Sequence, residues 1–349
     1  MKRKIAIVGL GAAAKTIHLP AYAKLPNLEV VGGFDPAIQQ GNFAFPLFTS
    51  VDELLDKAQP DILAIVTPTA THHELTRKGL LAGCHVLCEK PFMASMAEAN
   101  EITALAREKN RWVVVNNQYR FMDIHSAAKK AIGTPEFGEL LFINASQTFF
   151  VSEKTEAGWR GQETRRTCQE FGIHALDLCR FFFDEDPVAI YARMPKGKRP
   201  DGPDYLNLIR LEFSGDRVAH LGFDRLCRGP HRYLDMRLDG TQGCVETSIG
   251  GNIAFSAGIR GGSRKPYVNL DVTLGGSAVL YQGEKSRKIA SDPLDLFAHG
   301  TAQLMREFLA ALDQGGTPPC HADDNRRTLA LVHAAYDSHD QNKTIEMRY

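Results

Sequence analysis

The sequence predicts an α/β chain of two domains: a parallel sheet wound with helices, then an α+β unit with an open, mainly antiparallel sheet. Short apolar runs alternate with helical patterns up to about residue 115, which is typical of βαβ units. Beyond about residue 120, apolar and polar residues alternate, as in 234–239 (LDMRLD), which indicates strands with one solvated face. The 349 residues also exceed what one core usually holds.

The first domain is expected to span residues 1–120 and to contain a parallel sheet. Its candidate strands are short and mostly rich in β-branched residues, as buried parallel strands are. They are 4–8 (KIAIV), 29–34 (EVVGGF), 62–66 (ILAIV), 85–88 (HVLC) and 112–115 (WVVV). Helical patterns are expected from the first glycine turn to about residue 25, and at about 71–82 and 95–110.

The second domain, residues 121–349, is expected to carry the open sheet. Strands are predicted near 139–150, 187–193, 205–213, 217–225, 234–239 and 269–274. Helices are predicted at about 171–183, 299–313 and 323–337. The C-terminal helix is a candidate to pack back on the first domain.

The composition argues against several classes of protein. Lys plus Arg equals Asp plus Glu at 41 each, which disfavours a bulk nucleic-acid or membrane-surface binder. No apolar run approaches the roughly 20 residues of a membrane span. The start, MKRKIAIVGLGAAA, places glycines directly after a strand-like run, unlike a signal peptide. We therefore expect a cytoplasmic protein that binds neither nucleic acid nor membrane.

The seven cysteines are scattered and form no C-x-x-C pair. Such a pattern is typical of reduced cysteines in cores and strands rather than of a disulfide framework. We expect no metal site built from them.

A glycine motif between the first strand and the first helix predicts dinucleotide binding. Gly9, Gly11 and Ala14 form G-x-G-x-x-A. The first glycine permits a tight turn, the second lets the backbone approach a pyrophosphate, and the small third residue lets helix and strand pack closely. The helix N-terminus supplies free N–H groups for the phosphates. Alone the motif also fits an ordinary strand–turn–helix, but its place in the chain favours a Rossmann domain.

Asp35 ends the second strand and bears on the choice of cofactor. Its carboxylate would accept both ribose hydroxyls of the adenosine half, and its charge would repel a 2′-phosphate. No Arg or Lys follows until Lys57. These observations favour NAD over NADP.

Two groups in the sequence could move a proton. Lys90 directly follows the fourth strand, where ligands of open α/β sheets bind, although a lone lysine there is more often solvated. Glu170, His174 and Asp177 would share one face of a helix. Lysine and histidine can both remove a hydroxyl proton as a hydride leaves. The histidine could instead be structural, and Glu-x-x-x-His lacks a third zinc ligand, so no metal is expected.

The chain resembles the glucose–fructose oxidoreductase/inositol dehydrogenase (Gfo/Idh/MocA) family over nearly its whole length. EKP followed by G-I-H-x-x-D is specific in combination. The matching segments are GLGAAAKTIHLPAY at the glycine turn, TPTATHHE (67–74), EKP (89–91), QYRF (118–121), WR (159–160), EFGIHALD (170–177) and LDGTQGCVE (238–246).

This resemblance implies NAD(P)-linked oxidation or reduction of sugars, cyclitols or related polyols. It places Lys90 and His174 at the nicotinamide and the reacting substrate carbon, with Glu170 beside them as a further catalytic group. It also implies a homodimer or homotetramer formed through the open sheet. The other residues it assigns to the cofactor are Thr67, Pro68, His72, Glu89 and Gln118, and those it assigns to the substrate are Arg120, Trp159 and Arg160.

The sequence departs from the family pattern in two places. The stretch from Asp35 to Phe48 is too short for the helix usually found there. Glu170 stands where the family has an aspartate, four residues before His174, and we expect it to keep that role, with its carboxylate favouring a protonated imidazole or binding a substrate hydroxyl.

Two alternative functions and one question about substrate charge stay open at this stage. The same fold can retain NAD and use transient oxidation for elimination or glycoside cleavage. It can also serve as a non-catalytic NAD-binding regulator, although Lys90 and His174 are both present. Finally, Arg160, Arg165 and Arg166 could bind an acidic substrate, or could be solvated loop residues.

Overall fold

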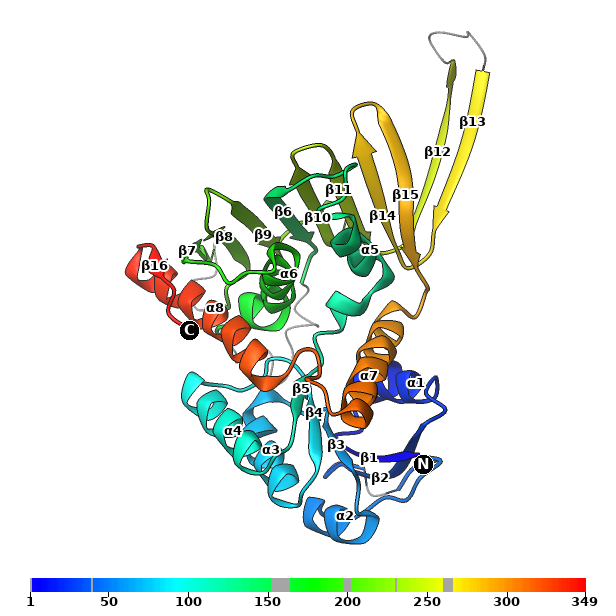
Figure 1. The fold of residues 1–349 in the computed structure, drawn as a ribbon, viewed down its shortest axis with the longest axis vertical. Coiled ribbons are helices and arrows are strands. Elements are labelled where there is room, and N and C mark those ends of the chain that lie inside the picture. The colour runs from blue at the N-terminus through cyan, green and yellow to red at the C-terminus, as the bar shows by residue number, and fades with distance from the viewer. Residues whose placement is uncertain (1, 39, 152–163, 197–201, 230, 260–265) are drawn as a thin grey trace.

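The computed structural model describes residues 2–38, 40–151, 164–196, 202–229, 231–259 and 266–349. Figure 1 shows two sheets, one in a unit near the N-terminus and a larger one beyond it, with the helices α7 (Leu296–Gln314) and α8 (Ala322–Gln341) running between them. The predicted two-part α/β fold is confirmed.

The first unit is built on a five-stranded parallel sheet in the order β2-β1-β3-β4-β5. All five predicted strands are present. They are β1 (Arg3–Val8), β2 (Leu28–Phe34), β3 (Ile62–Ile65), β4 (His85–Cys88) and β5 (Val113–Val115). The predicted helical stretches correspond to η1 (Ala14–His18) with α1 (Leu19–Tyr22), α3 (His72–Leu81) and α4 (Met96–Glu108).

One helix of this unit was not predicted. In α2 (Val51–Ala58), the Ser50 hydroxyl accepts a hydrogen bond from the Glu53 backbone N–H, and the Glu53 carboxylate accepts one from the Thr49 N–H. The S-x-x-E signature of a capping box was therefore legible in the sequence. Between β2 and α2, the described residues contain no helix, as expected for this short stretch.

The second unit is a nine-stranded sheet in the order β15-β14-β11-β10-β6-β9-β8-β7-β16. Neighbouring strands are antiparallel except β6 and β9, which run parallel. The strands are β6 (Leu140–Thr148), β7 (Ala189–Arg193), β8 (Leu206–Glu212), β9 (Val218–Asp224), β10 (Arg232–Gly240), β11 (Cys244–Ile249), β14 (Gly276–Gln282), β15 (Lys285–Asp292) and β16 (Ile345–Glu346).

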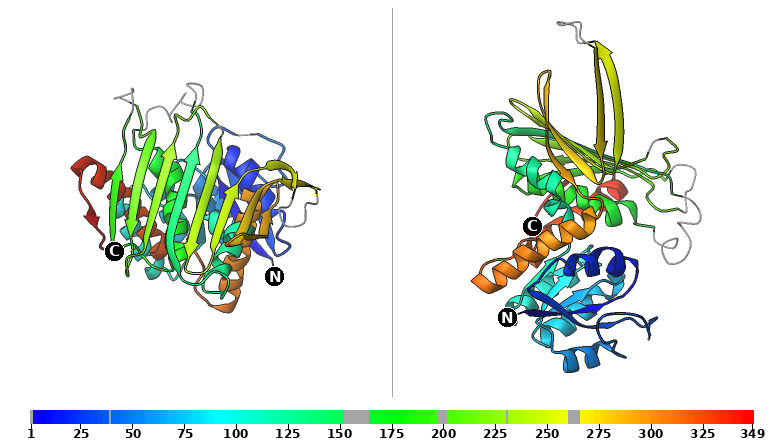
Figure 2. Two further views of the ribbon diagram at one scale, coloured as in Figure 1. Left: turned by 90° about the horizontal axis from the view of Figure 1, so that it is seen from above. Right: turned by 90° about the vertical axis from the view of Figure 1, so that its right-hand side faces the viewer.

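Helices cover one face of this sheet, and the other face is open (Figure 2, left). The covering helices are α5 (Asp123–Ala131), α6 (Ile173–Phe183) and α8. The helix predicted at 171–183 is thus present, and a π-helical turn, η5 (Cys168–Gly172), leads into it. The sequence did not predict β11, β14, β15, β16 or α5.

The two C-terminal helices join the units. Met305 and Phe308 of α7 pack in one core with Ile5 and Ile7 of β1, so this helix completes the first unit although it lies far along the chain. Near its start, α8 packs against α4 and β5, and further along it packs against α6 and β7. Because the site lies where the units meet, these helices set the spacing of its two halves.

Within the described part of the chain, no helix has both the length and the apolar composition needed to cross a bilayer.

Candidate functional site

A cavity of about 470 Å³ lies between the two units, at the carboxyl ends of strands of the parallel sheet. Loops after β1, β3 and β4 line one side of it, and the turn that leads into α6 lines the other. Several residues predicted from the sequence meet here. Among the lining residues are Gly11, Thr67, Pro68, Glu89, Lys90, Gln118, Glu170 and His174.

The glycine turn has the geometry that the motif predicted. Gly9 has a φ of +91°, and a β-carbon there would lie only 2.2 Å from the Val66 carbonyl oxygen, so no larger residue fits. Gly11 faces open space and leaves its backbone accessible from the cavity. Ala14 is fully buried beneath the turn. The turn can therefore bring backbone N–H groups close to a phosphate.

Asp35 lies beside this turn rather than in the wall of the main cavity. Its Oδ2 accepts a hydrogen bond of 2.8 Å from the Leu10 N–H, and its Oδ1 accepts one of 2.8 Å from the Ala37 N–H. A carboxylate has about four acceptor positions, so both oxygens retain capacity for a ligand.

Glu89 is held as a carboxylate by two residues that the sequence reasoning missed. Its Oε1 lies 2.7 Å from the His18 Nε2 and accepts a 2.7 Å hydrogen bond from the Asn116 Nδ2. Burial raises the pKa of Glu89, but the contact with His18, the charge of Lys90 and the Asn116 hydrogen bond outweigh burial and bring the pKa to about 2. A fixed negative charge therefore stands next to Lys90.

His18 is itself fully buried and lies 2.9 Å, through Nδ1, from the Tyr22 hydroxyl. Both residues belong to the segment IHLPAY, which had matched the family without a role being assigned to it.

The Lys90 side chain crosses from the first unit to the second. Its Nζ donates a 2.7 Å hydrogen bond to the carbonyl oxygen of Glu170 and lies 5.9 Å from the centre of the Phe171 ring. The Lys90–Pro91 peptide bond is cis. The lysine is thus held at the boundary of the two units, inside the cavity.

His72 does not line the cavity but joins two of the loops that do. Its Nδ1 lies 2.9 Å from the Pro91 carbonyl oxygen, and its Nε2 lies 2.9 Å from that of Thr67. Burial lowers the pKa of His72, while its contacts with the two carbonyl oxygens act in the opposite direction. The structure therefore places His72 behind the cofactor-side loop, as a support.

His174 lies against Tyr119, with ring centres 3.9 Å apart and planes 5° from parallel. Burial, followed by the charge of Lys90, lowers the pKa of His174 well below its usual value. This is the reverse of the expectation that a nearby carboxylate favours the imidazolium. The ring is neutral at neutral pH and is available to accept a proton.

Two buried polar atoms among the lining residues have no partner in the described part of the chain: Nδ1 of His174 and Oε1 of Gln118. Because both atoms belong to residues that line the cavity, each can form a hydrogen bond with a molecule bound there. With the open backbone at Gly11, they make a site that fits a dinucleotide and a polar substrate.

Glu170 lines the cavity as predicted. Its Oε2 lies 3.6 Å from the Arg166 Nε, and its carbonyl oxygen is the one that accepts from Lys90. Asp177, which a regular helix would place on the same face, does not line the cavity. The π-helical turn before α6 changes the helical register at this point.

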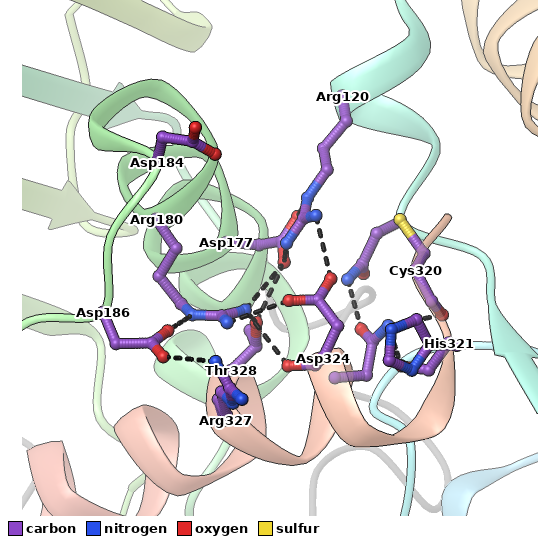
Figure 3. Close-up of polar contacts among 12 residues, drawn as sticks. Arg120, Asp177, Arg180, Asp184, Asp186, Cys320, His321, Asp324, Arg327 and Thr328 are labelled. Atoms are coloured by element: carbon purple, nitrogen blue, oxygen red, sulfur yellow. Dashed lines mark hydrogen bonds and ion pairs between the residues drawn. The ribbon is translucent and has the colours of Figure 1, made fainter. Parts of the chain in front are cut away.

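Arg120 does not line the cavity and belongs to a charged network (Figure 3). Its Nε and Nη2 each donate a 2.6 Å hydrogen bond to Asp177, and its Nη1 lies 2.9 Å from Asp324 of α8. Arg180 joins the network through Asp324, at 2.9 Å. The side chain of Arg120 therefore does not reach the substrate side of the cavity, because the buried Asp177 and the partly buried Asp324 hold it elsewhere.

The remaining predicted substrate residues are not placed in the cavity. Trp159 and Arg160 lie outside the described residues. Arg165 pairs with Asp340 at 2.9 Å on the surface, and the buried backbone N–H of Arg166 donates to Asp204. Among the described residues, no cluster of three or more His, Cys, Asp or Glu could hold a metal ion, and all seven cysteines are free.

Comparisons with known proteins agree with this arrangement. A family model described as "Oxidoreductase family, NAD-binding Rossmann fold" matches residues 3–117, and a model of the GFO/IDH/MocA C-terminal domain matches residues 125–246. D-apiose dehydrogenase of Paraburkholderia graminis is 24% identical over 99% of this chain and 90% of its own length. Glucose-6-phosphate 3-dehydrogenase of Bacillus subtilis is 29% identical over 53% of this chain and 55% of its own.

Solved structures share the fold over the whole chain. An oxidoreductase from Agrobacterium radiobacter in complex with NAD+, L-tartaric acid and magnesium has a TM-score of 0.80 at 18% identity and covers 99% of this chain and 98% of that one. myo-Inositol 2-dehydrogenase from Lactobacillus plantarum has a TM-score of 0.78 at 17% identity, with both chains fully covered. The two family models together span most of the chain in the expected order, and the chain belongs to the Gfo/Idh/MocA family of oxidoreductases, with an NAD-binding Rossmann domain.

Proposed function

We propose that this oxidoreductase uses NAD to transfer a hydride between nicotinamide and a secondary alcohol or ketone of a sugar, cyclitol or sugar derivative. The observation that carries the proposal is the meeting of Lys90 and His174, from different units, in one cavity whose walls contain buried unpartnered polar atoms. The relatives named above, which act on sugars by their names, support the substrate class.

The cofactor would be held by the loops of the first unit. The backbone at Gly11 would receive the pyrophosphate, and Thr67, Pro68 and Gln118 would line the nicotinamide side. Nicotinamide, when bound, supplies the hydride acceptor or donor. Asp35 beside the glycine turn supports NAD rather than NADP, because its charge disfavours a 2′-phosphate.

The proton would move through His174 during oxidation of the alcohol. Its depressed pKa keeps the imidazole neutral at working pH, so a ring nitrogen can accept the hydroxyl proton as the hydride leaves. Lys90 would donate a hydrogen bond from Nζ to the same oxygen and stabilise the negative charge that develops there. In the reduction direction the same groups act in reverse order.

Glu170 would complete the catalytic group. It lines the cavity four residues before His174, so its carboxylate is placed to accept a hydrogen bond from a substrate hydroxyl or to act on the imidazole.

We also propose an oligomeric state and a cellular location for the enzyme. The open face of the nine-stranded sheet would form a homodimer or homotetramer. Seven free cysteines support a reducing compartment, and so a cytoplasmic location.

The test is a panel of aldoses, cyclitols and sugar acids, each with NAD or NADP, followed by the absorbance of the reduced cofactor. We expect NADH formation with at least one neutral sugar or cyclitol, and a higher kcat/KM with NAD than with NADP. Consumption of a substrate without net NADH would instead indicate transient oxidation with retained NAD. Binding of NAD with no turnover across the panel would contradict the proposed activity.

A further inference from the structure

A two-stranded arm stands away from the body of the protein. Its strands, β12 (Asn252–Ile259) and β13 (Pro266–Thr273), pair with each other and with no other strand that the structure describes. They continue β11 and β14 beyond a bend at Gly250, whose N–H donates a 2.7 Å hydrogen bond to the Gly275 carbonyl oxygen. Figures 1 and 2 both show the arm projecting past the end of the large sheet.

The register of the arm gathers apolar residues at one set of paired positions. Ile253 pairs with Val272, Phe255 with Leu270 and Ala257 with Val268. Directly paired residues of antiparallel strands lie on the same face, and successive residues alternate between faces. The intervening pairs are polar on at least one side, such as Ser256 with Asn269 and Ala254 with Asp271.

On β13, the apolar residues at these positions are exposed to solvent. Val268 is 72% exposed, Leu270 63% and Val272 49%. Contiguous apolar surface of this kind marks interaction sites in natural proteins. A ribbon of two strands has no core of its own to cover its faces, so the exposed apolar residues of the arm offer a docking surface.

The size of the arm indicates what covers it. Each strand has eight residues, which at about 3.4 Å per residue gives a length of about 27 Å, and two strands are about 10 Å wide. One face then covers about 270 Å², so one arm on one partner would bury about 540 Å² in total, less than the roughly 1,000 Å² of a specific interface. Two arms exchanged reciprocally would bury about twice as much and reach that threshold.

We propose that the arm is exchanged between two copies of this chain, each arm lying with its apolar face on the uncovered face of the partner's nine-stranded sheet. That face includes Leu208 of β8, which is 53% exposed. The inference rests on the proposed homo-oligomer and specifies how it is held together.

The first experiment measures oligomeric state by light scattering after size exclusion, on the full chain. The double variant Val268→Asp/Leu270→Asp should raise the dimer dissociation constant at least 100-fold. Asn269→Asp is the matched control, because it adds a charge on the same strand at a position of the opposite face, and it should leave the dimer intact. Neither variant changes a residue that lines the cavity, so NADH binding should persist and report correct folding.

The second experiment places a photo-crosslinking residue, p-benzoylphenylalanine, at position 270 of the arm. Irradiation should give a product of twice the chain mass, and mass spectrometry should map the partner peptide to strands of the nine-stranded sheet. Crosslinks only within one chain, or to other proteins, would overturn the proposal. A dimer whose dissociation constant is unchanged in the double variant would also overturn the arm exchange. That result would leave a dimer formed through the open sheet alone as the assembly. A monomeric wild type would refute both forms of assembly and leave the proposed reaction untouched.

Discussion

Replacing Asp177 with asparagine removes the negative charge from the buried Arg120–Asp177 ion pair. This pair, called the fork below, consists of the two hydrogen bonds that Arg120 donates to the Asp177 carboxylate of α6. Both residues of the fork are close in sequence to residues that line the cavity. Arg120 directly follows Gln118 and Tyr119, and Asp177 is about one helical turn after His174. Because Tyr119 stacks on His174, the fork holds the catalytic ring against its neighbour. We therefore expect losses of both stability and activity.

The magnitude follows from what remains after the substitution. Breaking a buried ion pair costs about 3–5 kcal/mol of unfolding free energy when the surviving charge is left alone. In Asp177→Asn, Arg120 keeps its ion pair with Asp324 at 2.9 Å. We therefore expect a loss of unfolding free energy below that range, of about 2 kcal/mol. Arg120→Met leaves Asp177 with the Thr328 hydroxyl at 2.9 Å and Arg180 at 3.9 Å, and should cost about 3 kcal/mol.

The assay is urea unfolding of each single variant and of the double variant Arg120→Met/Asp177→Asn, with kcat and KM measured in parallel. The double variant should be more stable than the sum of the two single losses predicts, because it leaves no unpaired partner in the fork. Misplacement of His174 should lower kcat by about 100-fold while the Kd for NADH changes little. Losses that add to within about 0.5 kcal/mol, or an unchanged kcat, would refute the positioning role.

Three further predictions concern single residues. Asp35→Ser should narrow the preference for NADH over NADPH by about tenfold in titration calorimetry, since the repulsive charge is removed; an unchanged ratio would place the discrimination elsewhere. Glu170→Gln should lose a large part of the turnover, Glu170→Ala most of it and Glu170→Asp least, whereas a fully active alanine variant would make the residue a bystander. Burial lowers the pKa of His125 from its usual 6.5 to about 4, so the unfolded chain binds more protons and stability should fall as pH drops below 6.5, by about 2 kcal/mol from this residue between pH 7 and 5. His125→Asn should remove that part of the pH dependence of urea unfolding, and an identical pH dependence would contradict it.

The parallel sheet could be predicted because most of its strands are short apolar runs that are largely buried, so hydrophobicity marks them. The strands β11 and β15 were missed because their polar and charged residues, such as Glu246, Lys285 and Arg287, leave too few apolar positions to mark a strand. Of the arm, only the strand near 269–274, which overlaps β13, was predicted, and β12 was missed.

The site was predicted where chemistry is local in sequence and missed where it depends on tertiary contact. The glycine turn and Lys90 follow strands directly, so their positions could be inferred. His18 holds Glu89 across 71 residues of sequence, and Arg120 reaches Asp177 across 57, which no spacing rule reveals. The side chain of Arg120 contacts Asp177 and Asp324. Its place in the matched segment QYRF did not predict these contacts.

The central claim is that His174 takes the substrate proton and Lys90 stabilises the charge on the same oxygen in an NAD-linked reaction. The most direct measurement compares hydride transfer in wild type and Lys90→Met at saturating NAD, with NADH binding followed by fluorescence in the same preparations. The account predicts that turnover falls by at least about 10³-fold in the methionine variant, while the Kd for NADH stays within about threefold, because the dinucleotide rests mainly on the glycine turn. Near-normal turnover in Lys90→Met, with NADH binding intact, would contradict it.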